Sequence, residues 1–169
     1  MPALSYYHKE SGCSMWRSSQ CMNGIMNNRS MEDEIMLVEI GKTANNDKNL
    51  INNSRVVIYD ARPKINAQAN RYIKNGGYED LKNYKNCDIQ FCDIDNIHEV
   101  SRCFKKMYEI VSQPEMFNSS ETYGPILEST GKMFMISKIL KATNQIVDTM
   151  INKGVNVLVH CSDGWDRTA

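Results

Sequence analysis

Two short apolar runs stand out in the hydrophobic pattern of the chain. Residues 55–60 (Arg-Val-Val-Ile-Tyr-Asp) and 155–160 (Val-Asn-Val-Leu-Val-His) are rich in β-branched residues, and polar residues bound both. Continuous runs of this length are typical of strands that are buried on both faces of a sheet. A looser alternation of apolar and polar residues over 89–96 predicts a further strand.

Between these strands, apolar residues recur at helical spacing. They predict helices over 31–41, 64–74 and 97–111, and a longer helical region from Tyr123 to Lys153. The first helix has an N-cap candidate in Ser30, followed by an acidic first turn. Its apolar side is formed by Ile35, Met36, Leu37 and Ile40, and Gly41 is its predicted end.

Glycine and proline divide the later helices. Pro114 is expected to stop the helix over 97–111, Gly131 to divide the long region, and Gly154 to end it. The stripe of the helix over 97–111 is most simply core packing. It consists of Ile97, Val100, Phe104, Met107, Ile110 and Val111.

Strands that alternate with helices predict an α/β layered fold with a partly parallel sheet. Two segments lack a sustained period. Residues 1–28 are rich in Ser, Asn, Gly and Met and are interpreted as loops with one short extended piece, and the Asn-rich stretch 43–54 as a surface loop.

Composition narrows the class of protein. With 169 residues, 41% of them hydrophobic and 24% charged, the chain is expected to form one domain or part of one. The 20 basic residues balance the 20 acidic ones, so no overall field attracts nucleic acid. No apolar stretch is long enough to span a membrane, and no basic segment followed by an apolar one opens the chain. A cytoplasmic location is therefore expected.

The six cysteines show no Cys-x-x-Cys pair, which argues against a disulfide framework. A metal site is an alternative for four of the chain's Cys and His residues, but their irregular spacing favours free buried thiols. These residues are Cys87, Cys92, His98 and Cys103. No metal and no cofactor is predicted.

The strand over 155–160 leads into the strongest chemical motif, Cys-x5-Arg-Thr, which begins at Cys161 and ends at Thr168. A loop this short turns its backbone N–H groups toward one point, where a phosphate can sit. The same amides and the charge of Arg167 favour a thiolate at Cys161, which makes it a nucleophile. Arg167 can grip two phosphoryl oxygens at once. The alternative is a buried cysteine followed by a surface arginine; the preceding strand, Gly164 and Thr168 favour the phosphate loop.

Several ordered segments resemble the myotubularin family of phosphoinositide 3-phosphatases. They are Arg17-Ser18-Ser19-Gln20, Asp60-Ala61-Arg62-Pro63 with Asn66-Ala67 and Asn70, Gly76-Gly77-Tyr78-Glu79, Asn96-Ile97-His98, and the loop His160-Cys161-Ser162-Asp163-Gly164-Trp165-Asp166-Arg167-Thr168. The two aspartates and the tryptophan inside the loop distinguish this family from most protein-tyrosine phosphatases.

The resemblance implies a cysteine-phosphatase fold and hydrolysis of the 3-phosphate of phosphatidylinositol 3-phosphate and phosphatidylinositol 3,5-bisphosphate. The expected route is a phosphocysteine intermediate, and the expected partner is the lipid at endosomal-type membranes, to which the protein would be peripheral. It leaves open a homo- or hetero-oligomer with family members. Residues 1–169 would form a partial phosphatase domain, truncated after the loop and without a PH-GRAM domain.

The resemblance also implies roles for individual residues. Cys161 is the expected nucleophile, Arg167 the phosphate clamp and Asp166 the general acid, because the leaving inositol oxygen must collect a proton. The expected substrate-binding residues are Ser162, Asp163, Gly164, Trp165, Asn70 and Asn96. For the two asparagines, capping of a loop is an equally good interpretation.

Asp60 is a competing candidate for the acid, because many cysteine phosphatases keep their acid on a separate loop upstream, and the segment Asp60-Ala61-Arg62-Pro63 resembles such a loop. It also precedes Arg62, and an ion pair that holds this loop is the simpler role. Two other functions stay open: an inactive scaffold or binding protein of the same family, and a dual-specificity protein phosphatase.

Overall fold

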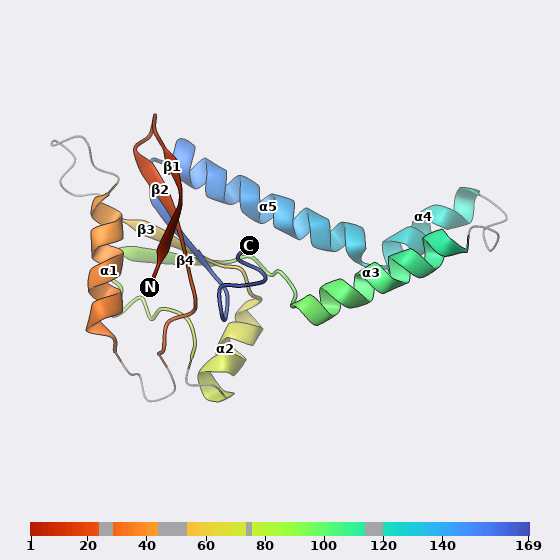
Figure 1. Ribbon diagram of the computed structural model, residues 1–169, viewed down its shortest axis with the longest axis horizontal. Coiled ribbons are helices and arrows are strands. Elements are labelled where there is room, and N and C mark those ends of the chain that lie inside the picture. The colour runs from red at the N-terminus through yellow and green to blue at the C-terminus, as the bar shows by residue number, and fades with distance from the viewer. Residues whose placement is uncertain (24–28, 44–53, 74–75, 114–119) are drawn as a thin grey trace.

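The computed structural model describes residues 1–23, 29–43, 54–73, 76–113 and 120–169, and a single sheet with helices around it organises them (Figure 1). The strands are β1 (Ala3–His8), β2 (Cys13–Ser18), β3 (Val56–Asp60), β4 (Cys87–Phe91) and β5 (Asn156–His160). The helices are α1 (Met31–Lys42), α2 (Lys64–Ile73), α3 (Ile97–Ser112), α4 (Ser120–Ser129) and α5 (Lys132–Ile151).

The sheet has the strand order β1-β2-β5-β3-β4. β1 pairs with β2 antiparallel, while β2, β5, β3 and β4 run parallel to one another. The predicted α/β fold with a partly parallel sheet is confirmed. Because β5 lies between β2 and β3, the carboxyl ends of strands from distant parts of the chain meet at one edge, where α/β sheets place their ligands.

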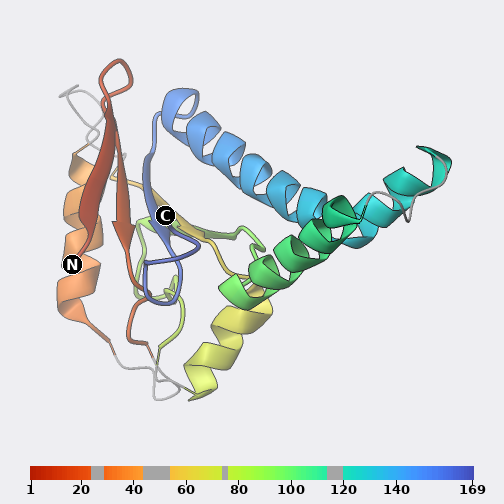
Figure 2. The same cartoon turned by 45° about the vertical axis from the view of Figure 1, so that its right-hand side comes forward.

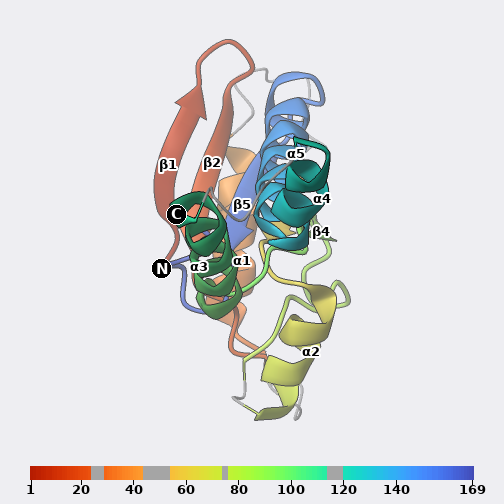
Figure 3. The same ribbon diagram turned by 90° about the vertical axis from the view of Figure 1, so that its right-hand side faces the viewer.

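Helices cover both faces of the sheet, as Figure 3 shows with α1 on one side and α5 on the other. Alternate residues of β3 point to the two sides: Val56 and Ile58 pack with α1, whereas Val57 and Tyr59 pack on the α5 side. Leu158 of β5 lies on the α1 side as well. Burial on both faces explains why these strands are continuous apolar runs in the sequence.

One buried amide ties three elements together. Asn156, fully buried at the start of β5, accepts hydrogen bonds from the backbone N–H and the hydroxyl of Ser14 in β2, at 2.8 and 3.0 Å. Its Nδ2 donates to the carbonyl oxygen of Ile40 at 2.6 Å and to that of Gly41 at 3.2 Å, near the end of α1. The side chain therefore fixes the end of α1 against the two strands.

The interpretation of the α3 stripe as core packing is wrong for this chain. Ile97, Phe104 and Val111 are 54, 59 and 55% exposed, and Cys103 is the buried residue of the helix. Figure 2 shows the reason: α3 and α4 extend away from the sheet together with the first half of α5. The stripe therefore meets no sheet face.

Other boundaries differ in smaller ways. The first 23 residues form the β1–β2 hairpin where one short extended piece was expected, because β2 adds to the edge of β5. β4 begins and ends earlier than predicted. Gly41 lies within α1, where a side chain would contact the carbonyl oxygen of Ser54, so its role is close approach and not helix termination.

Several local predictions are confirmed. Ser30 caps α1 by accepting a hydrogen bond from the backbone N–H of Asp33, and Gly131 separates α4 from α5 with a φ of 74°. α2 begins at Lys64 as predicted. The expected surface loop lies mostly outside the described residues, as does Pro114.

Replacing Asn156 with alanine should destabilise the fold by roughly 2–4 kcal/mol, because the partners in β2 and α1 are left buried without their hydrogen bonds. Urea unfolding followed by circular dichroism measures the change. Asn152→Ala is the control, since its side chain makes one exposed hydrogen bond, to Asp148. Equal effects of the two substitutions would contradict the role of Asn156.

Candidate active site

The Cys-x5-Arg loop leaves β5 at the edge of the sheet where the parallel strands end. It runs from Cys161 to Thr168, and the segment after β2 supports it: the backbone N–H of Gln20 donates to the carbonyl oxygen of Ser162 at 3.0 Å. Gly164 turns the loop with a φ of 80°, and a side chain there would lie 2.7 Å from the carbonyl oxygen of Ser18. Gly164 is the one loop residue with a positive φ, and it lies against β2. A glycine at this position therefore allows the tight turn of the loop.

The sulfur of Cys161 is the centre of the loop. It is buried at 3% exposure and accepts a hydrogen bond from the backbone N–H of Gly164 at 3.2 Å. Burial raises the pKa of this thiol, but the nearby Thr168 side chain, the amides of Gly164 and Asp163 and the Arg167 charge together lower the pKa below its ordinary value. The loop therefore favours a thiolate at Cys161.

Three other cysteines have the opposite electrostatics. Burial raises the pKa of Cys87 and of Cys92 to about 12, and it also raises the pKa of Cys21. All six cysteines are free thiols. Because a thiolate and not a thiol is the nucleophile, Cys161 is set apart from these three by its environment.

Arg167 brings an unused donor to the loop. Its Nη2 lies 3.5 Å from Oγ of Ser162, while its Nη1 is buried and has no hydrogen-bond partner among the described residues. A buried guanidinium nitrogen without an acceptor is costly, and an anion in the loop would satisfy it. Arg167 is therefore suited to hold a phosphate oxygen.

A buried ion pair lies beneath the loop. Asp60 and Arg62 have fully buried side chains, and the carboxylate of Asp60 accepts from Nε and Nη2 of Arg62 at 2.8 and 2.7 Å. Arg62 also donates to the carbonyl oxygen of Gly77 at 2.6 Å and to the side chain of Gln20. The expectation that Asp60 pairs with Arg62 and holds this region is confirmed.

His160, the last residue of β5, is fully buried next to the nucleophile candidate. Its Nε2 lies 3.2 Å from a carboxylate oxygen of Glu79, and its Nδ1 lies 3.0 Å from the carbonyl oxygen of Cys161. Burial disfavours the charged ring, but the charge and hydrogen bond of Glu79, together with the charge of Asp60 and the hydrogen bond to the Cys161 carbonyl, outweigh burial and raise the pKa of His160 to about 9. Burial likewise raises the pKa of Glu79, but the charge and hydrogen bond of His160, together with a backbone hydrogen bond and the charge of Arg62, outweigh burial and hold that pKa below its usual value.

Comparison with known protein families identifies the family of this chain. The model of the myotubularin-like phosphatase domain matches residues 1–169. The chain belongs to the myotubularin family of phosphatases.

Several relatives of known name are similar over nearly all of the chain. It is 43% identical over 168 residues to phosphatidylinositol-3-phosphate phosphatase MTMR7 of Mus musculus, covering 99% of this chain and 24% of that protein. It is 41% identical over 172 residues to phosphatidylinositol-3,5-bisphosphate 3-phosphatase MTMR2 of Gallus gallus, covering 100% and 28%. It is 38% identical over 170 residues to myotubularin of Xenopus laevis, covering 100% and 26%. The chain spans about a quarter of the length of these relatives.

The other residues implied by the resemblance occupy different places in this myotubularin domain. Asp163 and Asp166 are exposed in the loop, and Trp165 is 79% exposed beside them. Asn70 of α2 donates to Oγ of Ser162 at 3.0 Å, so it contacts the loop directly. Asn96 is exposed and caps α3, where it accepts from the backbone N–H groups of His98 and Glu99.

Two residues that support the myotubularin loop were not assigned a role from the sequence. Gln20 bonds to the loop and to Arg62, and Glu79 pairs with His160. Both lie in segments that carry the family resemblance, and that resemblance could have marked them as candidate site residues. Their partners are 142 and 81 positions away, so spacing along the chain gave no indication.

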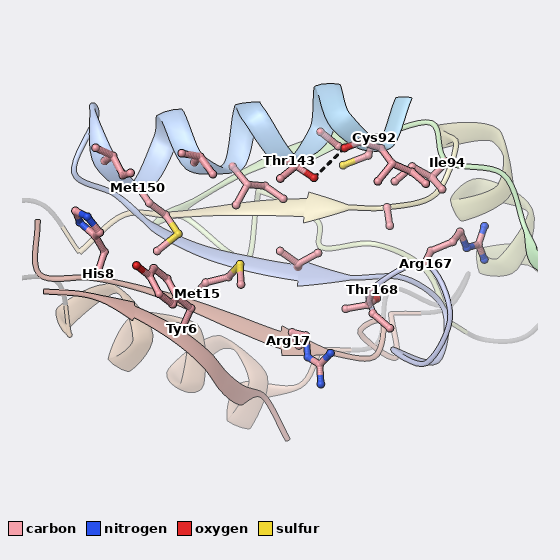
Figure 4. Close-up of a pocket in the computed structure, with 18 residues that line it drawn as sticks. Tyr6, His8, Met15, Arg17, Cys92, Ile94, Thr143, Met150, Arg167 and Thr168 are labelled. Carbon is pink, nitrogen blue, oxygen red and sulfur yellow. Dashed lines mark hydrogen bonds between the residues drawn. The ribbon is translucent and has the colours of Figure 1, made fainter. Parts of the chain in front are cut away.

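An apolar groove runs between α5 and the sheet and ends at the loop (Figure 4). It holds about 350 Å³ and is lined by Met15, Cys92, Ile94 and Met150 among others. Figure 4 shows Arg167 at its end, with the guanidinium directed away from the apolar part. The groove thus lies behind the loop, on the side away from the free Arg167 nitrogen.

Neither a metal-binding cluster nor a membrane-spanning helix is present among the described residues. It contains no group of three or more His, Cys, Asp or Glu residues placed to hold an ion, so the alternative metal site at Cys87, Cys92, His98 and Cys103 is not formed. Among the described helices, none has the length and apolar character to cross a bilayer.

Replacing Gly164 with alanine should displace the loop, because the new side chain would meet the carbonyl oxygen of Ser18 and the Gly164 amide would move from the Cys161 sulfur. We expect iodoacetamide to alkylate Cys161 several-fold more slowly at pH 6.5, as measured by mass spectrometry of the Cys161 peptide. Gly154→Ala is the matched control, since Gly154 has a φ of 63° but open space around it. A similar slowing in both variants would show that the contact with Ser18 is unimportant.

Proposed function

We propose that this domain carries the reaction loop of a phosphoinositide 3-phosphatase, which hydrolyses the 3-phosphate of phosphatidylinositol 3-phosphate and phosphatidylinositol 3,5-bisphosphate. The observation that carries the proposal is the environment of Cys161, whose sulfur accepts a loop amide while Arg167 keeps a buried nitrogen free for an anion. Two of the similar proteins are named as phosphatases of these two lipids, which supports the choice of substrate.

The chemistry proceeds in two displacements. The Cys161 thiolate attacks phosphorus, so a sulfur–phosphorus bond forms as the bond from phosphorus to the inositol oxygen breaks. Asp166 donates its proton to that oxygen. In the second step Asp166 takes a proton from water, the water oxygen attacks phosphorus, and Cys161 leaves as a thiolate with inorganic phosphate as product.

Arg167 and the loop amides stabilise the charge that spreads over the phosphoryl oxygens in both steps. The exposure of Asp163 and Asp166 supports their roles, since both side chains are open to a ligand in front of the loop. Asp163 meets inositol hydroxyls together with Ser162 in this proposal, and Gly164 and Trp165 complete the rim of the site.

The two asparagines enter the proposal differently. Asn70 supports binding through Ser162, to which it donates, and so acts from beneath the loop. Asn96 retains its proposed place at the margin of the substrate site, while its side-chain oxygen is engaged in capping α3. With a lipid substrate, the enzyme would work in the cytoplasm at the surface of endosomal-type membranes.

Replacing Cys161 with serine should abolish phosphate release, because a hydroxyl is a far weaker nucleophile at neutral pH. The assay uses the full gene product, including any sequence that adjoins residues 1–169. The protein is incubated with short-chain phosphatidylinositol 3-phosphate, and free phosphate is measured. Cys92→Ser is the control and should retain release. A phosphotyrosine peptide is tested in parallel; faster release from the peptide than from the lipid would favour a protein phosphatase, and no release from either would refute the proposal.

Replacing Asp166 with asparagine should lower kcat for the lipid by about 10²–10⁴-fold, because the leaving oxygen loses its proton donor. With an aryl phosphate as substrate, the substitution should slow the first-turnover burst of phenol by a smaller factor. An acidic phenol leaves without taking up a proton, so it does not need the acid. Asp163→Asn is the control, expected to raise KM for the lipid and to leave the aryl burst unchanged. If Asp166→Asn slowed the first step equally for the lipid and for the aryl phosphate, the assignment of Asp166 as the acid would be contradicted.

A further inference from the structure

Glu79 is a buried carboxylate that the proposed reaction leaves without a part. It lies in the segment between α2 and β4 and is 4% exposed. Its contact with His160, at 3.2 Å, places a carboxylate behind the strand end that leads into the loop. Burying an ionised pair is costly, and this one lies one residue from the reacting sulfur.

The two ring nitrogens of His160 both face oxygens that accept hydrogen bonds. Nε2 faces the carboxylate of Glu79, and Nδ1 faces the carbonyl oxygen of Cys161 at 3.0 Å. A neutral imidazole carries one N–H, so one of these contacts would set a lone pair against a lone pair. Against an ionised Glu79, only the doubly protonated ring satisfies both contacts.

The surrounding charges leave Glu79 as the counter-ion of this ring. Asp60, the other acidic residue that acts on His160, is already engaged on two sides by the guanidinium of Arg62. Arg62 and the neutral side chains of Cys21 and Tyr84 face Glu79 as well. Asp60 with Arg62 and Glu79 with His160 thus form two neutral buried pairs.

We propose that Glu79 is a positioning residue for the Cys161 nucleophile: it keeps His160 doubly protonated, so that the ring donates to the carbonyl oxygen of Cys161 and fixes the first peptide of the loop. The pair is also a dipole with its positive end toward Cys161, because the ring contacts the Cys161 backbone and the carboxylate lies on the ring's far side. This end stabilises the thiolate. The inference rests on the proposed function in assigning the thiolate to catalysis, but the state of the pair can be measured without a lipid.

The first test removes the negative end of the dipole. In Glu79→Gln the ring has no buried counter-ion and becomes neutral, so the apparent pKa of Cys161 should rise by about one unit. Alkylation of Cys161 by iodoacetamide below that pKa should then slow about tenfold. The rate is followed against pH by mass spectrometry of the Cys161 peptide.

Two control variants separate charge from structure. Glu79→Asp retains the carboxylate and should keep the Cys161 pKa closer to that of the unchanged protein, and the exposed Glu10→Gln should leave it unchanged. If His160 stayed protonated without Glu79, the loss of a negative charge would lower the Cys161 pKa. An unchanged or lowered Cys161 pKa in folded Glu79→Gln would therefore overturn the proposal.

A second measurement needs no substitution and decides the matter should Glu79→Gln fail to fold. ¹⁵N NMR of the unchanged protein, labelled at histidine, reports the protonation of the His160 ring. Two ring N–H groups at pH 7.5 and loss of charge near pH 9 are expected. A neutral His160 at pH 7.5 would overturn the proposal, whereas absence of lipid hydrolysis would refute only the proposed function.

Discussion

The buried ion pair between Asp60 and Arg62 is the interaction on which the site depends. Arg62 lies under the loop and binds groups from four segments: Asp60 at the end of β3, Gln20 after β2, Gly77 after α2 and, at 3.5 Å, Ser162 of the loop. Beyond the ends of the strands, the segments are no longer held together by the backbone hydrogen bonds of the sheet. The guanidinium of Arg62 fixes their relative positions instead. Because both side chains are fully buried, removing either partner would leave an uncompensated charge, which costs about 3–5 kcal/mol.

Above this pair, the loop balances two opposing influences on one sulfur. Burial acts to raise the pKa of Cys161, as it raises the pKa of Cys92 to about 12. The amides of the loop and the charge of Arg167 reverse this rise and lower the pKa of Cys161. The pKa values of Cys21, Cys87 and Cys92 are raised instead. The loop amides are fixed by the backbone, so the thiolate is favoured without any rearrangement when a substrate arrives. A reactive thiol is thereby kept away from bulk solvent.

Local patterns in the sequence predicted most of the elements, and long-range contacts explain what they missed. The strands β3 and β5 were recognisable because burial on both faces requires continuous apolar runs, and the N-cap of α1 because Ser30 bonds three residues ahead. The stripe of α3 was misinterpreted because an apolar helical face looks the same whether or not a sheet lies against it. Of the site, the loop was legible as a motif, and so was the pair Asp60–Arg62, two residues apart. The contact between Glu79 and His160 was not, since no local rule relates residues 81 positions apart.

The position of β5 in the sheet has a consequence for the order of folding. β5 follows the other four described strands in sequence, yet it lies in the middle, between β2 and β3. A nascent chain that has released β2 and β3 has no direct pairing between them, and each presents an open edge until β5 emerges. Such nonlocal closure is slow and exposes strand edges to other chains. The reactive loop follows directly on this strand, so it can take its shape only when the sheet closes. In a partly folded chain, Cys161 would therefore lack the environment that makes it a nucleophile.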